Sequence, residues 1–100
     1  MEVLTTREIA MAVGGIVSEE KQVNNVCIDS RKVQMGCLFI AIKGENFDGH
    51  DFINLAIQNG AHAVMSHKNI ECDVPVIMVE DTSKALLDLA GYYRSRFDIP

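Results

Sequence analysis

The run CLFIAI at residues 37–42 constrains the fold more than any other part of the chain, because every side chain in it is apolar. A strand with one solvated face alternates polar and apolar residues, whereas a strand covered on both faces reads as a continuous apolar run. We therefore expect residues 37–42 to form a strand buried on both faces, in a sheet that carries helices.

Elements of both kinds flank this strand. Further strands are expected over residues 26–30, 61–66 and 74–80, and helices over residues 5–15, 51–59 and 82–97. The order α-β-β-α-β-β-α predicts an α/β domain, with a small mixed β-sheet and about three helices packed on it. The middle helix suits a right-handed crossover between parallel neighbours. Residues 16–25 are polar and are expected to be irregular, and the order of the strands stays open.

Capping residues and helical spacing predict where the helices begin and end and which faces they bury. Thr5, with Glu8 three residues later, matches a capping box, and Gly14 or Gly15 can end that helix. Asp81 or Thr82 can cap the last helix, and Gly60 can end the middle one. The expected apolar stripes are Ile9, Ala10 and Val13 in the first helix, Phe52, Leu55, Ala56 and Asn59 in the second, and Leu86, Leu89, Ala90 and Tyr93 in the third.

Length and composition restrict the class of protein. A chain of 100 residues, 48% apolar and 23% charged, suits one folded domain over residues 1–100. The net charge of −5 argues against nucleic acid as a partner. No apolar run approaches the ~20 residues that span a bilayer, and the first residues lack the pattern of a signal peptide. We expect a cytoplasmic protein without a membrane span.

The three cysteines, Cys27, Cys37 and Cys72, are odd in number and have no paired spacing. We interpret them as reduced, small apolar residues. A zinc site is the alternative, but the chain has neither a CxxC nor an HxxxH pair to support it. Its ligands would be drawn from the cysteines and from His50, His62 and His67.

The segment before the buried strand contains Asp29, Ser30 and Arg31, which supply a carboxylate, a hydroxyl and a guanidinium in succession. Ligands of α/β sheets tend to bind where loops meet beyond strand ends. This trio could read a polar planar ligand, or orient a phosphate through Arg31. In the alternative interpretation, Asp29 caps a turn and Arg31 is solvated.

The segment after the buried strand, KGENFDGHDF at residues 43–52, has no core period. Gly44 and Gly49 permit sharp turns or a close approach of the backbone to a ligand. Between them, Phe47 could stack on a flat base, and Asn46 could donate and accept at one edge of that base. Glu45 lies beside them.

The end of the same segment stands where the next helix should start. The N–H groups of that helix, near His50 and Asp51, could face an anion. In the alternative interpretation, Phe47 and Phe52 belong to the core, Asp48 forms an Asx turn, and His50 or Asp51 is the helix N-cap. No phosphate loop, HExxH motif or serine nucleophile pattern is present.

Three stretches taken together resemble the N-terminal domain of the Mur ligases. They are TTREIAMAVGG, IDSRKVQMGCLFIAIKGENFDGHDFINLAIQNGAHAV and VPVIMVEDTSKALLDLAGYYRSRF. The pairing of DSRKVxxGxLF with KGExFDGHDFI is the most specific part. Within the family the chain is most similar to members that add D-alanyl-D-alanine. Members that add the third residue of the stem peptide are the alternative, and a non-catalytic regulatory or interaction domain of the same fold is a further one.

The resemblance implies a cytoplasmic, ATP-dependent amide ligase of peptidoglycan precursor synthesis that uses magnesium. Its N-terminal domain would hold the UDP end of UDP-N-acetylmuramoyl-tripeptide, while D-alanyl-D-alanine and ATP would bind through domains absent from residues 1–100. We therefore expect an excised domain that is inactive alone, with no catalytic or metal-ligating residue. Ser30 would contact the uridine, and the uracil pocket would be lined by Glu45, Asn46 and Phe47. The supporting residues would be Asp29, Arg31, Gly44, Asp48, Gly49 and His50.

Overall fold

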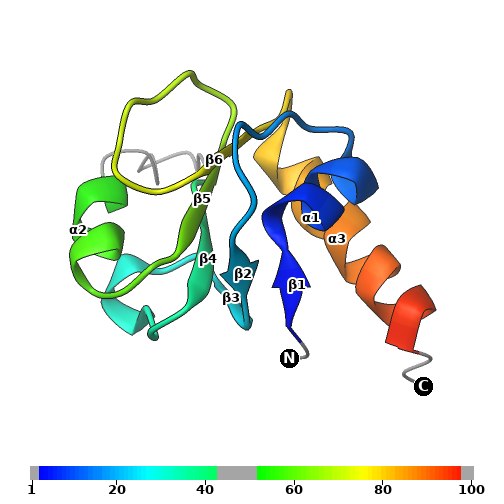
Figure 1. Ribbon diagram of the computed structural model, residues 1–100, viewed down its shortest axis with the longest axis horizontal. Helices are drawn as coiled ribbons and strands as arrows, with labels where there is room; N and C mark the ends of the chain where they lie inside the picture. The colour runs from blue at the N-terminus through cyan, green and yellow to red at the C-terminus, as the bar shows by residue number, and fades with distance from the viewer. Residues whose placement is uncertain (1–2, 43–51, 98–100) are drawn as a thin grey trace.

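The computed structural model describes residues 3–42 and 52–97, whose backbone forms two sheets and three α-helices (Figure 1). In chain order the elements are β1 (Leu4–Thr5), α1 (Thr6–Val13), β2 (Gln22–Val23), β3 (Asn25–Cys27), the 3₁₀ turn η1 (Ser30–Lys32), β4 (Cys37–Ile40), α2 (Ile53–Gln58), β5 (Ala63–Ser66), β6 (Val76–Met78) and α3 (Thr82–Phe97). The predicted α/β class is confirmed.

The larger sheet contains parallel strands in the order β3-β4-β5-β6. Its register places Val26 opposite Leu38 and Leu38 opposite Ala63. β4 and β5 are therefore parallel neighbours with α2 in the connection between them, as the alternation of elements predicted. The antiparallel part of the predicted mixed sheet forms a separate sheet, in which β1 pairs with β2.

The small sheet was missed by the sequence analysis, which expected residues 16–25 to be irregular. A strand of two residues is too short to show any periodicity, so its pairing could be found only in three dimensions. Buried Thr6 holds this segment against α1, because its Oγ1 donates to the Glu19 carbonyl oxygen (2.7 Å) and accepts from the Lys21 amide (3.0 Å). The segment thus has a fixed course on the way from α1 to β3.

Capping was predicted well for the first and last helices. Thr5 Oγ1 accepts from the Glu8 amide at 3.2 Å, and Gly14 ends α1 in a left-handed conformation with φ of 70°. At the start of α3, Asp81 Oδ1 accepts from the amides of Ser83 (2.9 Å) and Lys84 (3.1 Å). These bonds satisfy N–H groups that have no partner inside a helix.

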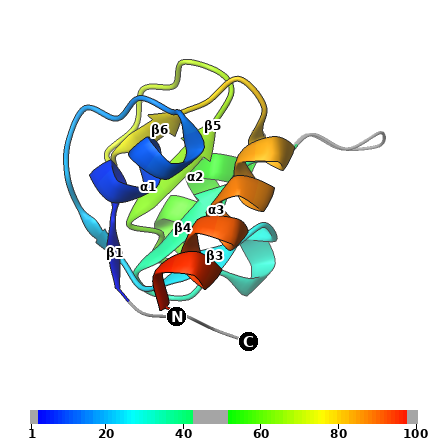
Figure 2. The same ribbon diagram turned by 90° about the vertical axis from the view of Figure 1, so that its right-hand side faces the viewer.

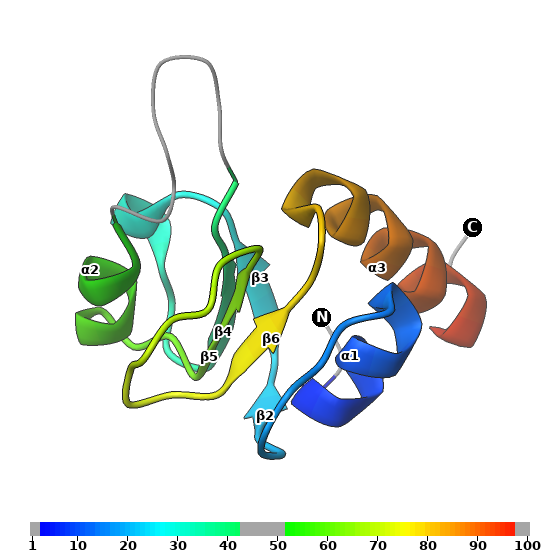
Figure 3. The ribbon, with the colours of Figure 1, turned by 90° about the horizontal axis from the view of Figure 1, so that it is seen from above.

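Helices cover both faces of the parallel sheet, with α2 on one side and α1 and α3 together on the other (Figures 1 and 3). Figure 2 shows α1 and α3 in front of the sheet and α2 behind it. Side chains of β4 alternate between the two layers: Leu38 and Ile40 pack towards α1 and α3, whereas Cys37 and Phe39 pack towards α2. The expectation of a strand buried on both faces is confirmed.

The buried face of α2 differs from the predicted one. Ala56 packs against the sheet as predicted, but Ile53 joins it there, whereas Phe52 and Leu55 are both 41% exposed and Asn59 is exposed as well. Small Ala56 lets the helix approach the sheet closely, and the neighbouring stripe then turns away from the core. The assignment of Phe52 to the core was therefore wrong. Phe52 also stands at the N-cap of α2, where His50 or Asp51 had been expected, and it makes no side-chain capping bond.

The buried face of α3 needs a smaller correction. Leu89 is buried and Leu86 and Tyr93 are partly buried, as predicted, but Ala90 is exposed and Ala85 takes its place in the core. The helix is rotated by a fraction of a turn relative to the stripe inferred from spacing. An alanine side chain has little apolar area, so exposing Ala90 in place of Ala85 costs little burial free energy.

Candidate functional site

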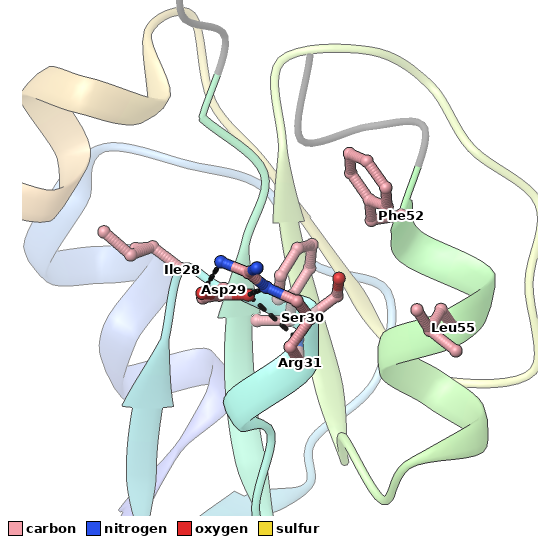
Figure 4. Close-up of a pocket in the computed structure, with 7 residues that line it drawn as sticks. Ile28, Asp29, Ser30, Arg31, Phe52 and Leu55 are labelled. Carbon is pink, nitrogen blue, oxygen red and sulfur yellow. Dashed lines mark hydrogen bonds and ion pairs between the residues drawn. The ribbon is translucent and has the colours of Figure 1, made fainter. Parts of the chain in front are cut away.

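The first part of the site is the turn η1, which follows directly from β3. Asp29 caps this turn, since its Oδ1 accepts from the backbone amide of Arg31 at 2.9 Å. The same carboxylate receives two further bonds from the Arg31 guanidinium, Nε to Oδ1 at 3.0 Å and Nη2 to Oδ2 at 2.9 Å (Figure 4). A short local network therefore fixes the backbone on both sides of Ser30.

This network changes the charge properties of the turn. The hydrogen bonds from the Arg31 side chain, and next the bond from its backbone amide, lower the pKa of Asp29 to about 2. In return, the side-chain bond to Asp29 raises the pKa of Arg31. The Arg31 side chain is 83% exposed, yet its charge is already engaged by Asp29. The pair thus presents little net charge to a ligand.

The second part of the site is a cavity of about 670 Å³ between η1 and α2. Its polar lining consists of Asp29, Ser30 and Arg31, and its apolar lining of Ile28, Phe39, Phe52 and Leu55. Figure 4 shows the Ser30 hydroxyl directed into the space between η1 and α2, with Phe52 and Leu55 on the opposite side. Ser30 is only 6% exposed.

The apolar lining is unusually open to solvent for side chains of this size. Ile28 is 50% exposed, and Phe52 and Leu55 are 41% exposed each, whereas Phe39 at the back of the cavity is 1% exposed. Exposed apolar side chains gathered around one concavity indicate a surface that a ligand covers. The combination with one nearly buried hydroxyl favours a flat, largely uncharged group with few hydrogen-bonding atoms.

The site residues predicted from sequence fall into two groups. Asp29, Ser30 and Arg31 come together at the cavity, as the structure shows directly. The others, namely Gly44, Glu45, Asn46, Phe47, Asp48, Gly49 and His50, lie in residues 43–51, outside the described residues. The described residue that leads out of this segment, Phe52, lines the same cavity as Ser30.

Sequence reasoning missed the apolar wall of the site. Phe52 and Leu55 are three residues apart and so share one face of α2, but the same spacing is typical of a core stripe. The signal that could have separated the two was Ile53, which forms with Ala56 a second apolar stripe that overlaps the predicted one. One helix on a small sheet can bury only one of them.

Residues 3–42 and 52–97 show no sign of a metal site or of a membrane span. In these ranges no group of three or more His, Cys, Asp or Glu side chains is arranged to hold a metal ion. None of the helices there combines the length and the apolar character needed to cross a membrane. The chain also has no glycine-rich lysine loop of the kind that binds ATP phosphates.

Comparison with known sequences places the chain in a family. The profile described as "Mur ligase family, catalytic domain" matches residues 22–94. A UDP-N-acetylmuramoyl-L-alanyl-D-glutamate–2,6-diaminopimelate ligase from Listeria innocua is 46% identical over 79% of the chain. UDP-N-acetylmuramoyl-tripeptide–D-alanyl-D-alanine ligases are 42% identical over 84% of the chain in Synechocystis, and 39% identical over 93% in Buchnera aphidicola. The chain spans only 16%, 19% and 21% of these three relatives.

Solved structures agree with the sequence comparison. A crystal structure of MurF from Acinetobacter baumannii matches 96% of this chain with a TM-score of 0.87 and 28% identity, over 22% of the MurF chain. MurF from Thermotoga maritima in complex with ADP matches 74% of this chain with a TM-score of 0.68 and 32% identity, over 17% of its own length. The chain therefore belongs to the Mur ligase family, and it has the fold of the N-terminal domain of these ligases.

Proposed function

We propose that this domain holds the UDP moiety of UDP-N-acetylmuramoyl-tripeptide, within a ligase that adds D-alanyl-D-alanine to the peptidoglycan precursor. The observation that carries the proposal is the cavity between η1 and α2, where one nearly buried hydroxyl faces half-exposed apolar side chains. The names of the relatives quoted above support the substrate class, since both kinds are named as ligases of UDP-N-acetylmuramoyl peptides.

Uracil suits such a cavity chemically. Its ring offers one N–H donor and two carbonyl acceptors on an otherwise flat, uncharged surface. The Ser30 hydroxyl can donate or accept at one of these positions, while Ile28, Phe52 and Leu55 can cover the ring faces. By family resemblance, Glu45, Asn46 and Phe47 complete the uracil pocket, and Gly44, Asp48, Gly49 and His50 support it.

The Asp29–Arg31 pair acts in this proposal through the shape of η1. Because the guanidinium is engaged by the carboxylate, it offers less to a phosphate than an unpaired arginine would. The pair instead holds the turn in the conformation that presents Ser30 to the cavity. The ring end of the nucleotide would therefore contribute more to binding at this cavity than the diphosphate.

The expected affinity of the domain alone is low. A neutral hydrogen bond contributes about 1 kcal/mol net, and stacking of a base about 1–3 kcal/mol. The loss of ligand freedom costs about 4 kcal/mol or more. We therefore expect UDP to bind at about millimolar concentration or weaker, and other domains to supply the remaining contacts with the full substrate.

The parent enzyme is proposed to be an ATP- and magnesium-dependent amide ligase, with residues 1–100 inactive alone. Two features support D-alanyl-D-alanine as the added group rather than a third stem residue. The matches to the two dipeptide-adding ligases extend over 84% and 93% of the chain, against 79% for the diaminopimelate-adding ligase from Listeria innocua. The solved structures quoted above are both of MurF.

Chemical-shift mapping with UDP tests the proposal. Backbone amides of residues 28–31, of Phe52 and of Leu55 should shift on titration, since these residues line the cavity. The groove formed by residues 69–72 and β6 on another part of the molecule serves as an internal control. Shifts confined to that groove, or no shifts at several millimolar UDP, would contradict the proposed function.

In the parent enzyme, Phe47→Ala supplies a second test. The base lies far from the chemistry, so the substitution should raise the KM of the nucleotide substrate with a smaller effect on kcat. An unchanged KM would refute the stacking role of Phe47.

A further inference from the structure

The C-terminal end of α2 carries a side chain that reaches across to η1. The Asn59 side-chain amide donates to the Ser30 carbonyl oxygen at 3.3 Å. Asn59 lies seven residues after Phe52 and four after Leu55, so the three share one stripe of the helix. The stripe that lines the cavity therefore also bonds to the residue whose hydroxyl faces it.

Ser30 is held from two sides as a result. On its own loop, Asp29 caps η1 through the Arg31 amide at 2.9 Å, and the Lys32 amide donates to the Asp29 carbonyl oxygen at 3.0 Å. On the other side, Asn59 fixes the Ser30 carbonyl to α2. The first set of bonds fixes the shape of the turn, whereas the bond from Asn59 joins the backbone of Ser30 to the end of α2, which carries the opposing wall.

Resting on the proposed function, we infer that Asn59 is a positioning residue for the uracil site. Its side-chain amide sets the separation between the Ser30 hydroxyl and the Phe52 and Leu55 wall, and with it the width of the space that receives the ring. Hydrogen bonding to a flat ring requires donor and acceptor within about 3 Å and well aligned, so a small change in this separation weakens both the hydrogen bond and the ring contacts.

A role in the helix end itself is separable from this one. The backbone amide of Asn59 donates to the carbonyl oxygens of Leu55 (3.0 Å) and Ala56 (3.2 Å), and any residue except proline supplies that donor. Asn59 is also exposed, so a change in its side chain leaves the core intact. Removal of the side-chain amide thus breaks the link to η1 without removing the backbone bonds that end α2.

Asn59→Asp is the most direct test, because it keeps the size of the side chain and replaces the donor by an oxygen that faces the Ser30 carbonyl. Asn54→Asp is the matched control, since it makes the same charge change on an exposed position of α2. Uridine is titrated beside UDP by chemical-shift perturbation, so that an effect on an uncharged ligand cannot come from the added charge. Urea unfolding of each variant is measured in parallel.

Asn59→Asp should weaken the affinity of the folded protein for both ligands about three- to tenfold, which corresponds to one hydrogen bond. Asn54→Asp should remain within about twofold of the wild type. A purely structural role would lower the urea midpoint and leave the affinity of the folded protein unchanged, and that result would overturn the inference. If Asn59→Asp does not fold, Asn59→Ala is measured instead. This variant should also lose affinity for both ligands, and an unchanged affinity would contradict the positioning role of Asn59.

The wild-type titration distinguishes a failure of the role of Asn59 from a failure of the proposed function. Binding by the wild type that persists unchanged in Asn59→Asp would overturn the role of Asn59 alone. Failure of the wild type to bind either ligand would overturn the proposed function, and the role of Asn59 with it.

Discussion

Replacement of Phe52 by alanine distinguishes a ligand-binding role from a core role more sharply than any other change in α2. Complete burial of a phenylalanine side chain contributes about 1.5–3 kcal/mol relative to exposure, and Phe52 is 41% exposed. Phe52→Ala should therefore lower the free energy of unfolding by about 1–2 kcal/mol. The reference is Phe39→Ala at the back of the cavity, 1% exposed, which should cost about 3–5 kcal/mol.

The same substitution should have a large effect on ligand binding. If Phe52 covers the uracil ring, removal of the Phe52 side chain takes away about 1–3 kcal/mol of stacking energy. The affinity for UDP should then fall at least fivefold. The initial slope of chemical-shift change against UDP concentration measures the affinity, and urea unfolding measures the stability. Leu87→Ala is the control, since Leu87 is 73% exposed on α3, remote from the cavity. An unchanged slope together with a loss of stability as large as that of Phe39→Ala would refute the reasoning.

Three further predictions concern the stability of the fold and the ionisation of two side chains. Gly91→Ala should raise the free energy of unfolding by about 0.5–1 kcal/mol, because Gly91 lies within α3 with open space beside it. Gly15→Ala should lower the free energy of unfolding, because the new Cβ would stand 2.9 Å from the Met78 carbonyl oxygen. Urea unfolding of both variants measures these changes, and changes of the opposite sign would contradict them. The pKa of the Asp29 carboxyl is lowered to about 2, so the ionised carboxyl contributes its full stabilisation at pH values above about 4, the ordinary pKa of aspartate. This stabilisation is lost as the pH falls towards 2. Carbon NMR of the side chain should show the titration, and a midpoint near pH 4 would contradict the lowered pKa. Burial raises the pKa of Cys37 to about 12, so a thiol reagent at pH 8 should leave it unmodified in the folded protein, and fast modification would contradict this.

Sequence reasoning was strongest where one residue type has one physical use. The run at residues 37–42 predicted β4 because a short, continuous apolar run between polar segments is typical of a strand covered on both faces. Thr5 and Gly14 predicted the ends of α1 because capping and a positive φ each favour few residue types. These rules act locally, so no knowledge of the rest of the fold was needed.

The sequence analysis was weaker where two arrangements satisfy the same pattern. Apolar residues at helical spacing in α2 fit a core stripe and a ligand wall equally well, and the rotation of the helix on the sheet decides between them. That rotation depends on how closely Ala56 approaches the sheet, which is a property of packing. The bond from Asn59 to Ser30 joins residues 29 positions apart and could not be inferred from either segment alone.

The most direct test of the account is an intermolecular nuclear Overhauser experiment on the chain with UDP. If the base binds in the cavity, the uracil H5 and H6 protons should show contacts to the methyl groups of Leu55 and Ile28 and to the ring of Phe52. Contacts from these protons only to residues of the β6 groove, such as Val74 and Val76, would show that the nucleotide base binds elsewhere and would contradict the account.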